Sequence, residues 1–185
     1  AEVVKHALIG DVDLMTHLED RLVAVFSRRD RSAIADTIER AVQVKAEIVA
    51  ADERETGRRA LLNFGHTFAH AIEAVAGYGA FSHGEAVAVG MRAGLYLSHR
   101  RHPNDIPRDR ADHLIRAIPV DADPSVLSFD ALYDAMAADK KNEGGTIRFV
   151  VLRRLGDAYV TGDVSRAEAE QAWQFACTPR NAGRP

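Results

Sequence analysis

The sequence has little cysteine, no long apolar run and little net charge, and each of these features excludes or disfavours a class of protein. Cys177 is the single cysteine among 185 residues, so a disulfide framework is excluded and a reducing cytosol is the expected location. No apolar stretch approaches the roughly 18–20 residues that a membrane-spanning helix needs, and no signal peptide is recognisable. The net charge of −3 gives no electrostatic reason to expect binding to nucleic acid or to an anionic membrane.

The composition that remains is typical of a soluble globular protein, with 46% hydrophobic and 28% charged residues. A chain of this length can bury the core of one domain, or form one large piece of a bigger enzyme. Its opening, AEVVKHALIGD, has the pattern of the middle of a helical element. We therefore expect a fragment, or a domain separated from an N-terminal half.

Helical periodicity dominates the chain. Capping-box patterns at Ser82–Glu85 and Ser165–Glu168 mark two helix starts. The apolar spacing predicts helices over residues 2–9, 11–28, 32–51, 57–77, 82–100, 110–117, 129–138 and 165–177. The period changes over residues 146–152 and 157–164, which predicts a small antiparallel hairpin. The predicted fold class is therefore mostly α, a helical bundle with one β-hairpin in a single domain over residues 1–177, followed by a frayed tail over 178–185.

The segment LLNFGHTFAHAIEAVAGYGAFSHGEAVAVGM holds the most informative polar residues. Asn63, His66 and His70 stand at i, i+3 and i+7, which is one stripe of the helix predicted here. His83 follows on the first turn of the next helix, where the helix dipole favours a neutral, metal-binding imidazole. Together they form a candidate metal and polar-substrate site. The simpler alternatives are a polar surface stripe for the pair and a plain capping-box neighbour for His83.

Lys45 gives a second signal, because it stands in the middle of an otherwise apolar stripe of the helix over 32–51. The other members of this stripe are Ile34, Ile38, Val42 and Val49. A buried ammonium needs an anionic partner or ligand. The alternative is a lysine whose stem is buried while its head reaches water.

Charged residues elsewhere add weaker signals. Glu55 and Arg59 lie in a charged connection that leads into the histidine helix, although such runs are usually solvated turns. Lys140 and Lys141 precede the hairpin, where they suit either a helix C-terminus or a phosphate. Glu2 and Lys5 form an i, i+3 pair, a common surface arrangement. The sum of three imidazoles, a carboxylate, several cations and an amide fits a divalent metal with a phosphorylated, carboxylated or polyhydroxylated ligand.

Four sequence motifs contain these candidate residues, and together they resemble one known family. In order, AEVVKHALIGD, KAEIVAADERETGRRALLNFGHTFAHAIE, FSHGEAVAVGM and DKKNEGGTIRFVVL resemble the C-terminal domain of 3-dehydroquinate synthase, over residues 1 to about 164. The resemblance implies a cytoplasmic, homodimeric lyase of the shikimate pathway that requires NAD and zinc or cobalt. That enzyme converts 3-deoxy-D-arabino-heptulosonate 7-phosphate, a phosphorylated sugar acid, to 3-dehydroquinate and phosphate.

The resemblance also assigns roles to individual residues. It implies that Glu2, His66 and His83 are the metal ligands. It implies further that the substrate's carboxylate, hydroxyls and phosphate are held by Lys5, Lys45, Arg59, Asn63 and Lys141, with Lys141 favoured over Lys140 for the phosphate. His70 would act near the phosphate and in proton transfer, and Glu55 would be a polar member of the site.

One part of the family enzyme is expected to be missing. The family binds NAD through a glycine-rich loop in an N-terminal α/β domain, and this chain contains neither that loop nor βαβ alternation. We therefore expect half an active site, no activity from the isolated chain, and an exposed apolar face where the other domain packs. A smaller departure is Ala69, where the family pattern favours glycine.

Two other functions compete with this interpretation. Related sugar-phosphate cyclases make 2-deoxy-scyllo-inosose or valiolone-type products, and the combination of Asn63 and His70 favours dehydroquinate synthase over them. A function of another class would be a non-enzymatic helical module that binds metal or docks a partner.

Overall fold

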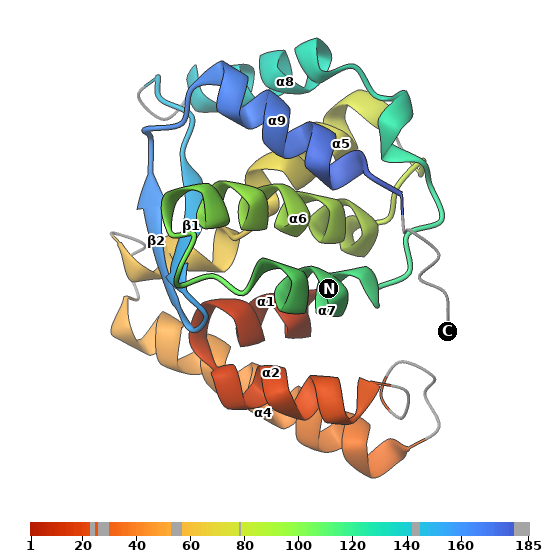
Figure 1. The fold of residues 1–185 in the computed structure, drawn as a ribbon, viewed down its shortest axis with the longest axis vertical. Helices are drawn as coiled ribbons and strands as arrows, with labels where there is room; N and C mark the ends of the chain where they lie inside the picture. The colour runs from red at the N-terminus through yellow and green to blue at the C-terminus, as the bar shows by residue number, and fades with distance from the viewer. Residues whose placement is uncertain (23–24, 26–29, 53–56, 78, 142–144, 180–185) are drawn as a thin grey trace.

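The structure is a computed structural model that describes residues 1–22, 25, 30–52, 57–77, 79–141 and 145–179, without the side chains of residues 140 and 141. Its helices are stacked in layers, with a two-stranded hairpin standing along one side (Figure 1). The elements are α1 (Glu2–Gly10), α2 (Val12–Asp20), α4 (Arg31–Ala51), η1 (Arg58–Asn63), α5 (His66–Ala76), α6 (His83–Arg101), α7 (Arg108–Arg116), η2 (Pro124–Val126), α8 (Phe129–Lys141), β1 (Phe149–Arg154), β2 (Asp157–Thr161) and α9 (Arg166–Cys177). The predicted class, a mostly helical bundle with one antiparallel hairpin, is confirmed.

Helix α6 forms the centre of the fold and packs against α5, α7, α9 and β1. Its sequence is rich in alanine, glycine and valine, and it is buried almost without interruption from Ala86 to Ser98. Small side chains allow neighbouring elements to approach on every side, whereas an amphipathic helix buries one stripe. The buried apolar residues of the described chain form one connected core around this helix.

The close contact between α5 and α6 depends on two glycines. Gly65 has a φ of +82° and precedes the first residue of α5, and a Cβ on Gly90 would lie 2.1 Å from the Gly65 carbonyl oxygen. The backbones of the two helices therefore touch where α5 begins. The prediction of one helix over 57–77 was wrong, because the left-handed turn at Gly65 separates η1 from α5. Asn63 consequently lies on η1 and does not share a helical stripe with His66 and His70.

Helix α4 packs with a different face from the one expected. Its buried residues are Ala33, Thr37, Ala41, Val44 and Ile48. Ile38 is 52% exposed and Val42 59% exposed, and Lys45 lies on the same outward side. The prediction of Lys45 on a buried stripe was therefore wrong. The small residues Ala33, Thr37 and Ala41 bring α4 close to α1 and α2, and the larger aliphatic residues one position further on point outward.

The hairpin and the helix caps follow the sequence more closely. Strands β1 and β2 pair antiparallel, with Val151 opposite Tyr159, and they are shorter than the two segments predicted. Gly156 turns the chain with a φ of +78° and donates its N–H to the carbonyl of Leu8, which joins the hairpin to α1. The capping boxes at Ser82 and Ser165 are both present.

The described part of the tail predicted over 178–185 consists of Thr178 and Pro179, and Thr178 is hydrogen-bonded. The hydroxyl and carbonyl of Thr178 accept hydrogen bonds from the guanidinium groups of Arg92 and Arg116. Residues 180–185 lie outside the described part of the chain. Within the described residues, no helix combines the length and apolar character that a membrane span requires.

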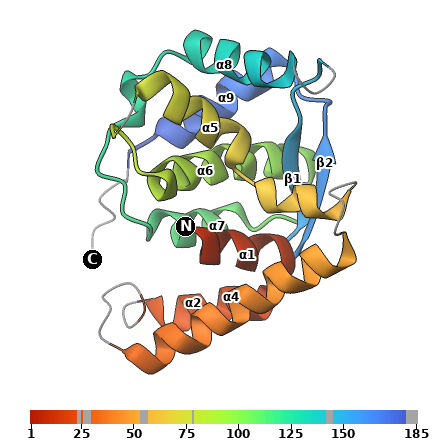
Figure 2. The same cartoon turned by 180° about the vertical axis from the view of Figure 1, so that it is seen from behind.

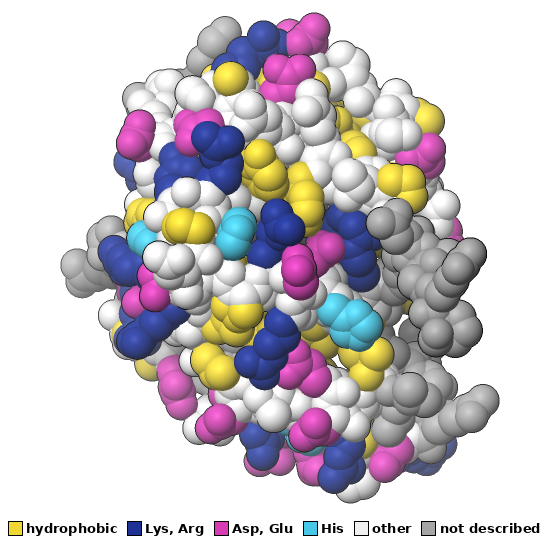
Figure 3. Space-filling view, in the orientation of Figure 1, with side chains coloured by type: hydrophobic (Ala, Val, Ile, Leu, Met, Phe, Trp, Pro, Cys, Tyr) yellow, Lys and Arg dark blue, Asp and Glu magenta, His cyan; other side chains and the backbone are white. Residues whose placement is uncertain are grey.

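The surface that carries α9, α6, α7 and α2 has side chains of both charges interspersed (Figure 3). Ion pairs connect neighbouring helices here, for example Arg110 on α7 with Glu19 on α2 at 2.7 Å. Exposed pairs of this kind add little stability because water screens them. The cavity at the candidate site opens between α1, α4, η1 and the start of α5, and Figure 2 shows the molecule from that opposite side.

Candidate metal and ligand site

Three helix N-termini bring the predicted metal ligands together. Glu2 begins α1, His66 begins α5 and His83 begins α6, and these three helices lie one above another in Figure 2. One potential ligand atom from each residue lies within 4.8 Å of those of the other two. Two imidazole nitrogens and one carboxylate oxygen at this spacing suit a catalytic divalent cation with positions left open. The site predicted for Glu2, His66 and His83 is therefore geometrically possible.

Each histidine is oriented by a hydrogen bond of its Nδ1 atom. The His66 Nδ1 lies 3.3 Å from the carbonyl oxygen of Phe64, and the His83 Nδ1 lies 3.0 Å from Oε1 of Glu73. When Nδ1 carries the proton in both rings, the Nε2 lone pairs are free to bind a metal. Such oriented imidazoles are typical of metal centres in proteins. The His66 Nε2 also lies 3.9 Å from the Glu2 carboxylate, as expected for two ligands of one ion.

The surroundings of Glu2 and His66 favour a negative carboxylate and a neutral imidazole. Lys5 is 3% exposed and donates a 2.7 Å hydrogen bond to Glu2. Burial acts to raise the pKa of Glu2, but the hydrogen bond and charge of Lys5, with a contribution from His66, outweigh it and lower that pKa. Burial, followed by the charge of Lys5, lowers the pKa of His66. Lys5 is thus buried, whereas the side chain of Glu2 is 49% exposed, so the pair joins the interior of the site to its surface.

A cavity of about 210 Å³ opens beside the metal ligands, between α1, α4, η1 and the start of α5. It is lined by Glu2, Lys5, His6, Lys45, Val49, Arg59, Leu62, Asn63 and His66. Four residues that the sequence assigned to substrate binding thus meet in one place: Lys5, Lys45, Arg59 and Asn63. Three cations and an amide around one small cavity suit an anionic, hydroxylated ligand.

The remaining predicted site residues are placed less directly. His70 is exposed one turn along α5, with its ring centroid 5.6 Å from that of His66, and it is not among the residues that line the cavity. Glu55 lies outside the described residues, and so do the side chains of Lys140 and Lys141 at the end of α8. The structure therefore brings together most, but not all, of the predicted set.

Two contributors to the site were missed by the sequence reasoning. Asp52 accepts hydrogen bonds from the backbone N–H groups of Gly57 and Arg59, at 2.7 and 3.0 Å, and so fixes the start of η1. His6 lines the cavity and is buried. A histidine inside the apolar run VVKHALI was the signal that could have identified His6, because a polar ring in a buried helix needs a reason to be there.

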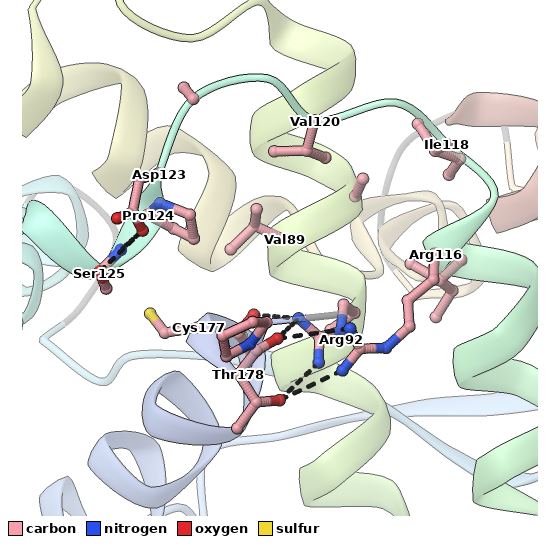
Figure 4. A pocket seen from close by; sticks show the side chains of 15 residues that line it. Val89, Arg92, Arg116, Ile118, Val120, Asp123, Pro124, Ser125, Cys177 and Thr178 are labelled. Atoms are coloured by element: carbon pink, nitrogen blue, oxygen red, sulfur yellow. Dashed lines mark hydrogen bonds between the residues drawn. The ribbon is translucent and has the colours of Figure 1, made fainter. Parts of the chain in front are cut away.

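A larger cavity, of about 450 Å³, lies away from these residues, between α6, α7 and the segments around η2 and Thr178 (Figure 4). Its lining is mainly apolar, including Val89, Ile118 and Val120. The guanidinium of Arg92 points at Asp112, at Thr178 and at the backbone carbonyls of residues 175, 176 and 178, which use its donors. This cavity is larger, but its charged groups are already engaged, Arg92 and Arg116 with Asp112, and Asp123 with Ser125, so we place the candidate site at the histidines.

Comparison with known proteins relates this chain to one family of enzymes. Residues 1–142 match the family described as 3-dehydroquinate synthase C-terminal. The chain is 68% identical over 178 residues to 3-dehydroquinate synthase from Salinibacter ruber, covering 96% of this chain and 48% of that protein. It is 45% identical to the same enzyme from Caulobacter vibrioides, covering 90% and 47%. The chain thus spans about half the length of the curated relatives it matches.

Solved structures show the same fold in related cyclases. ValA, the 2-epi-5-epi-valiolone synthase from Streptomyces hygroscopicus subsp. jinggangensis with NAD⁺ and Zn²⁺ bound, superposes with a TM-score of 0.81 at 29% identity, covering 95% of this chain and 49% of that one. A 2-deoxy-scyllo-inosose synthase complexed with carbaglucose-6-phosphate, NAD⁺ and Co²⁺ gives 0.63 at 21% identity over 94% and 49%, a likeness of fold alone. With the family match over most of its residues, the chain belongs to the 3-dehydroquinate synthase C-terminal domain family.

Proposed function

We propose that this chain is the metal- and substrate-binding half of a 3-dehydroquinate synthase. The assembled enzyme would convert 3-deoxy-D-arabino-heptulosonate 7-phosphate to 3-dehydroquinate and phosphate. One observation carries the proposal: three potential metal ligands from separate helices lie within 4.8 Å of one another, beside a cavity lined by three cations and an amide. The 68% identity to a relative with this name supports the choice of reaction.

In this proposal Glu2, His66 and His83 hold a divalent metal, zinc or cobalt, as in the related cyclase structures that contain these ions. When bound, the metal supplies Lewis acid chemistry to substrate oxygen atoms. Glu73 and the carbonyl of Phe64 keep both imidazoles turned toward it. Lys5 balances the charge of Glu2 through its hydrogen bond, and it would also offer donors to a bound anion.

The cavity residues would hold the two anionic ends of the substrate. Lys5, Lys45 and Arg59 supply donors for its carboxylate and phosphate, and the Asn63 amide binds a hydroxyl. His70, exposed one helical turn beyond His66, would act near the phosphate and in proton transfer. Lys141 and Glu55 belong to the proposed site through the family resemblance, and Lys141 would bind the phosphate.

The proposed partner is the half of the relatives' chain that this chain does not cover, and we propose that it binds NAD, as the related cyclase structures do. The outward face of α4 is the surface where it would pack. Ile38 and Val42 are more than half exposed on this face, and further along the same stripe Lys45 and Val49 line the cavity. The assembled enzyme would be a cytoplasmic homodimer, and the isolated chain would be inactive.

Metal content tests the site directly. We expect the isolated chain to bind one zinc ion, and Glu2→Ala, His66→Ala and His83→Ala each to weaken binding by more than a hundredfold, because each removes one of three ligands. His70→Ala, on the same helix as His66, is the matched control and should bind zinc normally. Unchanged zinc stoichiometry in all three ligand variants would falsify the assignment.

Activity tests the reaction. We expect no phosphate release when the isolated chain is given the sugar-acid phosphate, NAD and zinc. Release should appear after co-expression with the N-terminal half of the Salinibacter ruber relative. Turnover by the isolated chain would contradict the division of the site between two halves.

A second candidate is a valiolone-type cyclase, which the TM-score of 0.81 to ValA favours. The two functions differ in whether the substrate carries a carboxylate. In the co-expressed protein, turnover of a sugar phosphate without a carboxylate, in preference to the sugar acid, would establish the second candidate. If the chain bound metal but no co-expressed half restored turnover of either substrate, the proposed enzyme would be replaced by a metal-binding module.

A further inference from the structure

His6 has an environment that the proposed roles do not explain. It lies on α1, is 5% exposed, and forms part of the cavity wall with Lys5 and Lys45. Neither of its ring nitrogens has a hydrogen-bond partner or meaningful contact with solvent. Among the described residues, His6 alone leaves two buried side-chain polar atoms unpaired in this way.

An unpaired buried polar atom is destabilising, and native proteins contain few of them. Phenylalanine or leucine at this position would fill the space without that penalty. Burial, followed by the positive charge of Lys5, lowers the pKa of His6 to about 4, so the ring is neutral at pH 7. It then carries one donor and one acceptor, and both lack a partner.

The neighbours of His6 show which group would complete these hydrogen bonds. Lys5, Lys45 and Arg59 carry donors but no acceptor. They match carboxylate and phosphate oxygens but cannot accept the proton of a hydroxyl group, which leaves the Glu2 carboxylate, the Asn63 amide and the His6 ring as acceptors in the lining. A neutral imidazole can accept that proton, and it can also donate to a second oxygen.

The ring can present either edge to the cavity. A half-turn about the Cβ–Cγ bond exchanges Nδ1 with Cδ2 and Nε2 with Cε1 while the ring occupies the same volume. The nitrogens can therefore face a bound ligand without a change in the packing of α1.

We infer that His6 is a ligand-binding residue of this cavity, which accepts a hydrogen bond from a hydroxyl of a polyhydroxylated, anionic ligand. This inference rests on the proposed function of the cavity, and it assigns the recognition of a hydroxyl to a residue outside the metal and cation set. His6 thereby distinguishes a hydroxylated ligand from a simple anion of equal charge.

Calorimetric titration of the zinc-loaded chain, with two probes, tests this role. The probes are 3-deoxy-D-arabino-heptulosonate 7-phosphate and inorganic phosphate. We expect His6→Phe to weaken binding of the sugar-acid phosphate roughly tenfold, the loss of about one hydrogen bond. Binding of inorganic phosphate should change less than twofold. His6→Gln, which keeps a donor and an acceptor, should restore part of the lost affinity for the sugar-acid phosphate.

His17→Phe is the matched control. His17 Nε2 lies 3.0 Å from the hydroxyl of Thr37, away from the cavity, so its loss should lower the melting temperature without changing either affinity. His6→Phe should keep or raise the melting temperature, because it removes two unpaired polar atoms. The ¹⁵N shifts of the His6 ring in the wild-type chain give a readout without substitution, and they should move when the sugar-acid phosphate is added.

The outcomes separate this inference from the proposed function. Wild-type binding with no effect of His6→Phe, or with no movement of the His6 ring shifts, overturns the role of His6 and leaves the proposed function standing. Equal weakening of both probes also overturns it, because that indicates general damage to the cavity. Failure of the wild-type chain to bind either probe overturns both proposals.

Discussion

Helices α6 and α4 are of similar length, 19 and 21 residues, and they meet their surroundings in opposite ways. Helix α6 is covered on all sides, with small residues that let backbones touch. Helix α4 buries one stripe and leaves Ile38 and Val42 in solvent. His83 stands at the N-terminus of α6 and the proposed substrate cation Lys45 stands on the open side of α4. One proposed metal ligand is thus attached to the most enclosed helix of the fold, and one proposed ligand-binding cation to the open side of α4.

This difference has a physical reason. A metal site needs ligand atoms fixed to within a few tenths of an ångström, which a helix packed on all sides supplies. If the proposed second half packs on α4, that face of the helix has to stay uncovered in the isolated chain. Four sets of substitutions test whether α6 and α4 differ in this way, and they follow in order of expected effect.

Gly90→Ala should have the largest effect. The added Cβ would lie 2.1 Å from the carbonyl oxygen of Gly65, and backbone cannot move aside as a flexible side chain can. We expect a loss of about 3 kcal/mol or more in the free energy of unfolding, together with weaker zinc binding because His66 follows Gly65. Urea denaturation and zinc titration measure the two effects.

Gly84→Ala is the control for this substitution. It lies on the same helix, but its added Cβ would meet only the Cβ of Ala1 at 3.8 Å, an ordinary contact. Its stability should therefore stay close to that of the wild type. Equal stability of the Gly90 and Gly84 variants would show that the contact between α5 and α6 is not rigid.

Glu73→Ala should have the next largest effect, on metal affinity. The change removes the carboxylate that orients His83, while all three proposed metal ligands stay in place. We expect zinc affinity to fall roughly 10- to 100-fold, with the free energy of unfolding of the metal-free chain nearly unchanged. Competition with a chromogenic chelator measures the affinity. An unaltered affinity would mean that His83 is held in place by α6 alone.

Ile38→Ser combined with Val42→Ser tests the open face of α4. Both residues are more than half exposed, so the free energy of unfolding of the isolated chain should change by less than about 0.5 kcal/mol. Association with the N-terminal half of a relative should weaken roughly tenfold, because the apolar contact is lost. Val126→Ser, which changes a residue 75% exposed on η2, serves as the control. Equal association of both variants would place the interface elsewhere.

Glu85→Gln should have the smallest effect, because Glu85 lies in the solvent-accessible first turn of the otherwise buried helix α6. The hydroxyl of Ser82, then the backbone N–H groups of Ser82 and Asp121, lower the pKa of Glu85 to about 2. A lowered pKa in the folded state means that the carboxylate stabilises the fold above its unfolded pKa, near 4.5, and that this contribution disappears as the pH falls toward 2.

Glutamine keeps the shape of the capping box but loses the charge that favours a helix N-terminus. We therefore expect the urea midpoint of Glu85→Gln to lie slightly below that of the wild type at pH 7, and the gap to be smaller at pH 3 and to close only near pH 2. A gap of constant size at both pH values would attribute the effect to altered hydrogen bonding instead of charge.

The positions at which sequence reasoning failed have one cause in common. The segment 57–77 has a helical apolar pattern throughout, yet the helix is interrupted at Gly65. The backbone at Gly65 packs directly against Gly90, which is distant in the sequence, and the pattern of residues 57–77 contains no sign of that contact. The stripe containing Lys45 is the more apolar side of α4 by side-chain size, yet the side with Ala33 and Thr37 is buried because it fits closely against α1 and α2. In both places close packing, which is not encoded in local hydropathy, decided the outcome.

The fold class, the helix caps at Ser82 and Ser165, the hairpin and the family of the chain could all be predicted from the amino-acid sequence. These depend on local periodicity, on side-chain-to-backbone hydrogen bonds and on motif order, all of which are written along the chain. Only the tertiary structure decided that Glu2, His66 and His83 converge, that α4 turns Ile38 and Val42 outward, and that His6 lies unpaired in the cavity wall. Those facts depend on distances between segments far apart in the sequence, which close packing of backbones sets.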